Sequence, residues 1–350
     1  MDRSIQKQRV IYLDILRICA TLAVIMNHVS AAFLMNTDVT SGSWNICNLF
    51  GGCVRWPVPT FFMISGILFL GREVDFVRRY RTNILRIVTA FLFWSGIYSF
   101  FNFIKTKDVE LMIHELIHGH YHMWFLFVIL EIYILLPVIK RITESDALMK
   151  YFLVVAFVFT ILIPSIADYI AIFDLKAESD IRGVLNSFSV LPQLQYIFFF
   201  VFGFYLSRVK LTSRFVRVCV ALGAIGFVGT VIISTVYSRY LGTANLTFYN
   251  VGINFFLQTL GVFVFARWKL EDRIFSERTN KLLVGVSNCT FGIYLVHVLV
   301  LENLETLVVT VSSAAQALAW CVGGTCITFG ISLVISWGLS KIPVLNKYLI

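Results

Sequence analysis

Three ionisable residues lie within the first long apolar segment of the chain, residues 13–35: Asp14, Arg17 and His28. Because an α-helix turns about 100° per residue, Arg17 and His28 lie within about 20° of one face, and Asp14 precedes Arg17 by one turn. Arginine suits a phosphate or carboxylate, and histidine exchanges protons near neutral pH. Such groups usually face a bundle interior or a water-filled cavity. The stripe predicts a functional polar path. The structural alternative is an Asp14–Arg17 pair, with His28 bonded to a neighbouring helix.

The composition is that of a membrane protein. Of 350 residues, 58% are hydrophobic and 14% charged, whereas soluble domains have about 25% charged residues. Many apolar runs approach the roughly 20 residues that a helix needs to cross a bilayer. We expect an all-α integral membrane protein, a bundle of about ten transmembrane helices in a single domain over 1–350, with no separate soluble domain. The spans are predicted near 13–35, 56–70, 85–104, 123–139, 151–167, 191–206, 216–237, 248–266, 285–301 and 317–339.

The distribution of charge predicts the orientation. With the N-terminus in the cytoplasm, most of the 29 Lys and Arg residues fall in cytoplasmic segments, which is the positive-inside pattern. We therefore expect both termini in the cytoplasm. The net charge of +9 is mostly a topology signal, and no basic soluble module indicates nucleic-acid binding. Cys47 and Cys53 share the predicted first external loop, where a disulfide and two free thiols are both open.

A basic run stands at the entrance to the third span, with Arg78, Arg79, Arg81 and Arg86. Clustered arginines on the cytoplasmic side are what the topology alone requires. The functional alternative is a clamp for the phosphates of a cytoplasmic donor, because guanidinium groups match phosphate geometry.

The fourth span and its approach contain His122, Trp124 and Glu131. A carboxylate in mid-span is expected to pair or to stay protonated. Glu131 is thus a candidate proton acceptor or a partner for Arg17 or His28, and a structural bond between helices is the alternative.

Further histidines occur in two places. Tyr294 and His297 lie three residues apart in the ninth span, where a histidine is often a structural hydrogen bonder. An external set precedes the fourth span and contains no cysteine, so we expect no metal there. An acceptor-binding or pH-sensitive loop and a simple solvated loop remain open for it. The set consists of His114, His118, His120 and His122.

Four stretches, in order, resemble the integral-membrane acyltransferase family 3. Residues 12–17 with His28 are similar to its L-D-x-L-R start and Arg-x10-His pair, and residues 58–66 to its P-x-F-F-x-x-S-G. Residues 122–137 resemble its His-x-Trp-Phe-Leu…Tyr-x-x-x-Pro, and 291–297 its I-Y-L-x-H. The tail from Lys341 resembles that of single-domain O-acetyltransferase members.

The resemblance implies transfer of an acetyl group from cytoplasmic acetyl-CoA to a hydroxyl of an envelope glycan or lipid-linked saccharide. The place would be the bacterial cytoplasmic membrane, with the bilayer as a further partner, and no metal is implied. His28 would be the catalytic base or acyl carrier. The expected catalytic set is His28, Arg17, Asp14 and Glu131. The donor would be held by Arg78, Arg81, Arg86 and Ser65. The acceptor would meet His122, Trp124, Tyr294 and His297.

The chain departs from the family pattern at two places. The family's Arg-x-x-Arg before a Pro corresponds in the best register to Asn83 and Arg86, with Ala90 in place of the Pro. Many long members have a Glu five residues after the Trp of the fourth span, where this chain has Ile129.

Two other classes of protein are alternatives to an enzyme for this sequence. A secondary transporter or flippase would also need ten spans and buried charge, but the ordered motifs and the lack of a detectable internal repeat disfavour it. A non-catalytic membrane sensor with histidine pH switches is the second.

Overall fold

The computed structural model describes residues 10–349 except 72–75, 174, 189 and 309, and leaves out the side chains of 76–81, 175, 192 and 193. Every regular element among the described residues is helical. In the part of the chain that the structure describes, nine helical segments are long and apolar enough to cross a membrane. These findings confirm an all-α integral membrane bundle. The nine segments are 11–34, 42–70, 82–106, 109–144, 146–170, 213–241, 247–270, 277–305 and 314–340.

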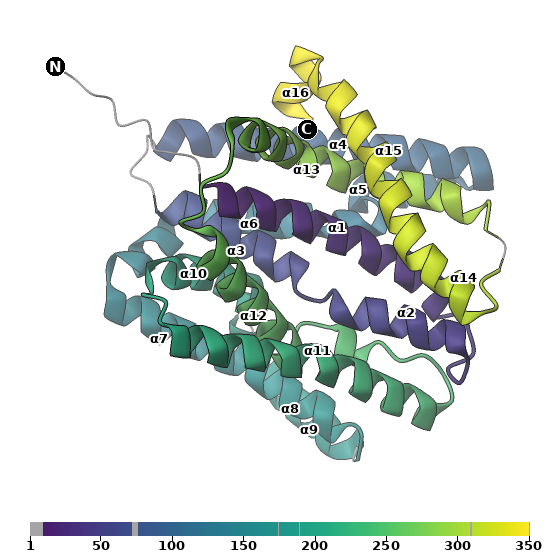
Figure 1. Ribbon diagram of the computed structural model, residues 1–350, viewed down its shortest axis with the longest axis horizontal. Helices are drawn as coiled ribbons and strands as arrows, with labels where there is room; N and C mark the ends of the chain where they lie inside the picture. The colour runs from purple at the N-terminus through teal and green to yellow at the C-terminus, as the bar shows by residue number, and fades with distance from the viewer. Residues whose placement is uncertain (1–9, 72–75, 174, 189, 309, 350) are drawn as a thin grey trace.

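Helix α1 (Ile11–Leu34) lies at the centre of the molecule (Figure 1) and packs against helices from several parts of the chain, those over 42–53, 57–70, 253–270, 277–305 and 325–340. Helices α2 (Gly42–Cys53) and α3 (Pro57–Leu70) follow one another back along α1, separated only by residues 54–56. Pro57 occupies the first position of α3, where its missing N–H costs nothing. The second span is therefore a broken helix over 42–70, rather than a single short helix over 56–70.

The broken helix corrects the expected loop around Cys47 and Cys53. Both cysteines belong to α2 and have free thiols, so of the two alternatives for this pair the structure shows the free thiols. Six residues apart on one helix, they point in different directions. Arg55, which the charge pattern assigns to an external loop, lies at the break instead and is 8% exposed.

The sixth predicted span, 191–206, is present as a shorter helix. It consists of η3 (Leu191–Leu194) and α10 (Gln195–Arg208), and it is not among the nine segments above. Glycines let α10 lie directly against α3: a Cβ on Gly66 would overlap the carbonyl of Phe200, and one on Gly203 would overlap the backbone of Met63. Such small residues allow close helix packing in a membrane.

The other helices surround this core, and several begin at a capping side chain. Ser276 Oγ accepts from the backbone N–H of Thr279, and Thr212 Oγ1 accepts from that of Phe215. The remaining membrane helices are α4 (Phe76–Thr106), α6 (Trp124–Glu144), α7 (Asp146–Phe157), α11 (Ser213–Leu241), α12 (Ile253–Leu270), α13 (Glu277–Glu305) and α15 (Thr325–Ser340). Shorter elements are α5 (Val109–His118), η1 (Tyr121–Met123), η2 (Val158–Leu162), α8 (Ile163–Ile170), α9 (Leu175–Asn186), η4 (Thr247–Tyr249), α14 (Ala314–Ala319), η5 (Trp320–Gly324) and α16 (Pro343–Tyr348).

The last apolar stretch, 307–339, is too long for one simple span, and in the structure the span begins only at residue 314. Residues 314–340 form one continuous helical segment of α14, η5 and α15, and residues 306–308 and 310–313, which precede it, are not helical. Trp320 in η5 donates its indole N–H to the carbonyl of Val29 in α1, at 2.9 Å. This bond fixes the last span against α1.

The α3–α10 contact generates a stability prediction. Gly66→Ala would force the two backbones apart, and overpacking of this kind typically costs about 1–3 kcal/mol. We expect a lower midpoint of thermal unfolding in detergent for this variant. Gly229→Ala in α11 is the matched control, because a Cβ there meets no atom within 4 Å and alanine favours a helix. Equal midpoints for the two variants would contradict the close packing.

Candidate active site

A cavity of about 670 Å³ lies between α1, α3, α4, α6, α12 and α13. Arg17 and His28 both line it, as their spacing on one helix face predicts, and about 16 Å of helix rise separates them. The cavity therefore extends along α1 from the end that the charge pattern assigns to the cytoplasm into the outer half of the bundle.

Arg17 is held in the cavity wall by its neighbours. The hydroxyl of Ser287 in α13 donates to Asp14 Oδ1 at 2.6 Å, and Arg17 Nη1 lies 3.4 Å from Ser287 Oγ and 3.8 Å from Asp14 Oδ1. Asp14 is buried and does not line the cavity. The predicted pair of Asp14 and Arg17 is thus present, and it orients a guanidinium that faces the cavity.

The same end of the cavity contains the residues predicted for the donor. Ser65, Asn83 and Arg86 line it, and the Arg86 guanidinium lies 5.2 Å from the ring centroid of Phe291. Asn83 and Arg86, the two residues that align with the family's Arg-x-x-Arg in the best register, therefore face the cavity. The side chains of Arg78 and Arg81 lie outside the described residues.

Aromatic and imidazole rings gather around the other half of the cavity. His28 lies 5.2 Å from His297 and 5.6 Å from Tyr121, measured between ring centroids. His122, Trp124 and Tyr294, predicted to meet the acceptor, all line the cavity. His297 is fully buried behind the wall, and its Nδ1 donates to the Tyr294 carbonyl at 2.7 Å.

The predicted external histidine set divides into two parts. His114 and His118 lie on the exposed helix α5, with ring centroids 4.3 Å apart. His120 and His122 are buried, with 6% and 2% of their surface exposed. Only the second pair belongs to the region of the cavity, so these four residues do not form one external loop.

Glu131 lies apart from this site. It is on an exposed face of α6 with Phe127 and Ile134, and it does not line the cavity. The predicted pairing of Glu131 with Arg17 or His28 is therefore wrong. Ile129, at the position where many long family members have a Glu, does line the cavity.

Sequence reasoning missed Arg55, a cation that lines the cavity at the break between α2 and α3. Its Nε donates to the Gly51 carbonyl at 2.5 Å, its Nη2 donates to Asn27 Oδ1, and its guanidinium carbon lies 4.2 Å from the ring centroid of Tyr249. No carboxylate contacts it among the described residues. The signal that could have found it is its place three residues before the second motif, residues 58–66.

The charges on the wall decide what the cavity can hold. Arg17, Arg55 and Arg86 line it, and no Asp or Glu is among its lining residues in the described part of the chain. A cationic wall in a low-dielectric surrounding attracts anions. The cavity can thus bind an anionic molecule and bring it next to a histidine that exchanges protons.

Comparison with known proteins gives one match. The family of the acyltransferase domain matches residues 10–337. No curated protein and no solved structure matches the chain. The matched region begins just before α1, ends within α15 and so contains the whole cavity wall. The chain therefore belongs to this family, the integral-membrane acyltransferases of family 3.

Proposed function

We propose that this membrane acyltransferase is an O-acetyltransferase. It moves an acetyl group from cytoplasmic acetyl-CoA to a hydroxyl of an envelope glycan or a lipid-linked saccharide, in the bacterial cytoplasmic membrane. The observation that carries the proposal is the cavity itself: among the described residues that line it, three arginines and no carboxylate share the wall with His28.

The charges of the donor fit the cytoplasmic end of the cavity. Coenzyme A carries several phosphates, and guanidinium groups bind phosphate through charge-assisted hydrogen bonds. In our proposal the phosphates meet Arg86, together with Arg78 and Arg81 from the preceding turns of α4. The thioester then lies along α1 past Arg17 and reaches His28.

The histidines fit the chemistry of the transfer. A thioester is already activated, so the protein needs to position it and to remove a proton from the attacking hydroxyl. His28 serves as the base or carries the acetyl group in passing. Arg55 also lines the cavity and donates to Asn27, the residue before His28. In our proposal it offers a positive charge to the oxyanion that forms at the carbonyl.

His28 is the first residue to test. We expect His28→Ala to lower transfer of radiolabelled acetyl from acetyl-CoA into the glycan and lipid fractions of membranes by at least about 10²-fold, the usual contribution of a positioned base. Cys19→Ala, on an exposed position of the same helix, should keep wild-type activity.

Two results would count against the assignment. Undiminished turnover by a well-inserted His28→Ala protein would exclude His28 from the chemistry. Movement of an unmodified substrate across vesicles by the wild type without acyl-CoA, and no label in any fraction, would favour a transporter over the enzyme.

Arg86 tests the place of the donor. Loss of a charged hydrogen bond costs about 1.5–3 kcal/mol, so Arg86→Ala should weaken acetyl-CoA binding by about 10- to 100-fold and affect the acceptor much less. Equilibrium binding of labelled acetyl-CoA to the purified protein measures this. Arg141→Ala is the control, since that side chain is 82% exposed. Unchanged donor affinity in Arg86→Ala would contradict the clamp.

A further inference from the structure

We propose that His122 is the base that takes the proton of the acceptor hydroxyl, and that Glu302 and His120 hold it in the form that can do so. The inference rests on the proposed function and deepens it, because it assigns the proton to His122 and leaves His28 to act on the acetyl group. The three residues form a chain behind the outer half of the cavity.

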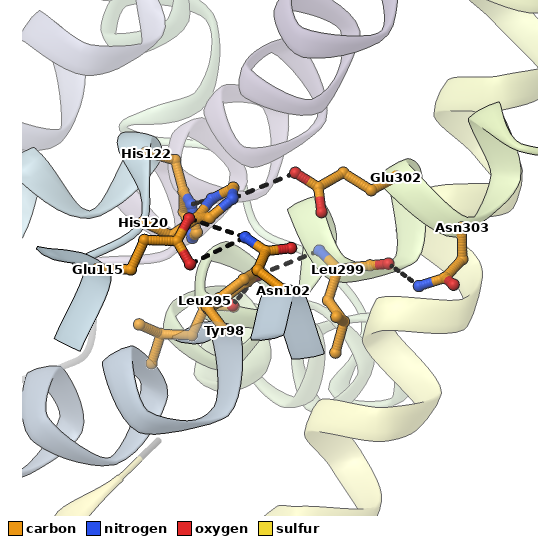
Figure 2. Close-up of polar contacts among 9 residues, drawn as sticks. All are labelled: Tyr98, Asn102, Glu115, His120, His122, Leu295, Leu299, Glu302 and Asn303. Atoms are coloured by element: carbon orange, nitrogen blue, oxygen red, sulfur yellow. Dashed lines mark hydrogen bonds and ion pairs between the residues drawn. The ribbon is translucent and has the colours of Figure 1, made fainter. Parts of the chain in front are cut away.

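Two short contacts connect the chain, and Figure 2 shows them in sequence. Glu302 Oε1, from α13, lies 3.2 Å from His120 Nε2. His120 Nδ1 lies 3.2 Å from His122 Nδ1. His120 and His122 come from the short segment that leads into α6, and only His122 lines the cavity. Glu302 therefore reaches the cavity through two imidazole rings.

The contacts determine which ring nitrogens carry protons. A carboxylate only accepts hydrogen bonds, so His120 presents an Nε2–H to Glu302. A neutral His120 then has a bare Nδ1, which accepts the Nδ1–H of His122. His122 is left with a bare Nε2, whose lone pair is the proton acceptor that a general base needs.

The environment of His122 leaves that nitrogen available. His122 Nε2 is buried and has no hydrogen-bond partner among the described residues. The Leu295 carbonyl, which accepts a bond from Tyr98 Oη at 2.8 Å, also lies close to the His122 ring. A buried polar atom without a partner costs free energy, which a substrate hydroxyl would recover.

Other contacts keep the chain rigid. The ring of Tyr98 stacks on His120, with centroids 4.5 Å apart and planes at 21°. The hydroxyl of Tyr294 donates to the backbone carbonyl of His122 at 2.7 Å. A second carboxylate in this region, that of Glu115, accepts two bonds from the amide of Asn102 instead, at 2.7 and 2.9 Å. Glu302 is thus the carboxylate that orients His120.

The transfer step balances without a further reactant. The hydroxyl of the acceptor gives its proton to His122 Nε2 while its oxygen forms the new C–O bond with the acetyl carbon. The bond from that carbon to its carrier breaks, whether the carrier is the CoA sulfur or a nitrogen of His28, and the leaving atom takes the proton from His122. Glu302 and His120 are positioning residues: like the aspartate of a Ser-His-Asp triad, the carboxylate selects the tautomer and stabilises the imidazolium.

The test compares Glu302→Gln, Glu302→Asp and His122→Gln with the wild type in membrane vesicles. The probes are radiolabelled acetyl-CoA and the membrane fraction that the wild type labels. We expect Glu302→Gln to lower kcat at least about tenfold, up to the roughly 10⁴-fold seen when a triad loses its carboxylate. The KM for acetyl-CoA should stay within about twofold, Glu302→Asp should recover part of the rate, and His122→Gln should lose the most.

Glu305→Gln, one turn further along α13, is the matched control and should behave like the wild type. A Glu302→Gln variant with the wild-type kcat would overturn the proposed Glu302–His120–His122 chain. So would a variant in which only the KM for acetyl-CoA changes. A wild type that labels no fraction would instead refute the proposed function, so the two failures are distinct.

A second measurement needs no turnover. Nitrogen-15 NMR of the rings of the six histidines reports which nitrogen of each carries a proton, and His122→Gln identifies the signals of His122. We expect an unprotonated Nε2 on His122 in the wild type and loss of that single tautomer in Glu302→Gln. A proton found on Nε2 of His122 in the wild type at neutral pH would overturn the proposal, even where Glu302→Gln fails to fold.

Discussion

The arrangement of this protein depends on the cost of placing charge in a bilayer. An arginine facing lipid near the centre of the membrane is expensive, so guanidinium groups must face an interior that supplies partners or water. Arg17, Arg55 and Arg86 come from three parts of the chain and all line one cavity. The same constraint acts on the backbone, because the break at residues 54–56 occurs where the chain faces this cavity and Gln258 Oε1 accepts the N–H of Arg55 at 3.2 Å.

The sequence predicted the cavity wherever one helix determined the geometry. The positions of Arg17 and His28 follow from the helical repeat alone, and the register of Asn83 and Arg86 follows from the family motif. The prediction for Glu131 was wrong for a physical reason. Helix α6 is apolar on most sides, so its pattern does not show which face meets the bundle. The neighbours decide this, and they turn Ile129 and Tyr133 inward.

The broken second span was beyond sequence reasoning for a related reason. Residues 42–53 contain asparagines and glycines and therefore resemble a loop. In the fold, the amide of Asn48 donates to Thr235 Oγ1 at 2.7 Å and accepts from Ser234 Oγ at 2.8 Å. These partners come from α11, nearly two hundred residues later. A polar helix is stable at membrane depth only with such partners, and a local pattern does not reveal them.

Both ends of the cavity place a carboxylate behind the wall rather than on it. Asp14 contacts Arg17 directly and through Ser287, and Glu302 contacts His122 through His120. A carboxylate on the wall would repel an anionic donor. A carboxylate behind the wall compensates the positive charge of the group in front of it and fixes the orientation of the group that the substrate meets. In our proposal the wall thus presents Arg17 and Arg86 to an anionic donor at one end and His122 to a hydroxyl acceptor at the other, where Arg55 also lies.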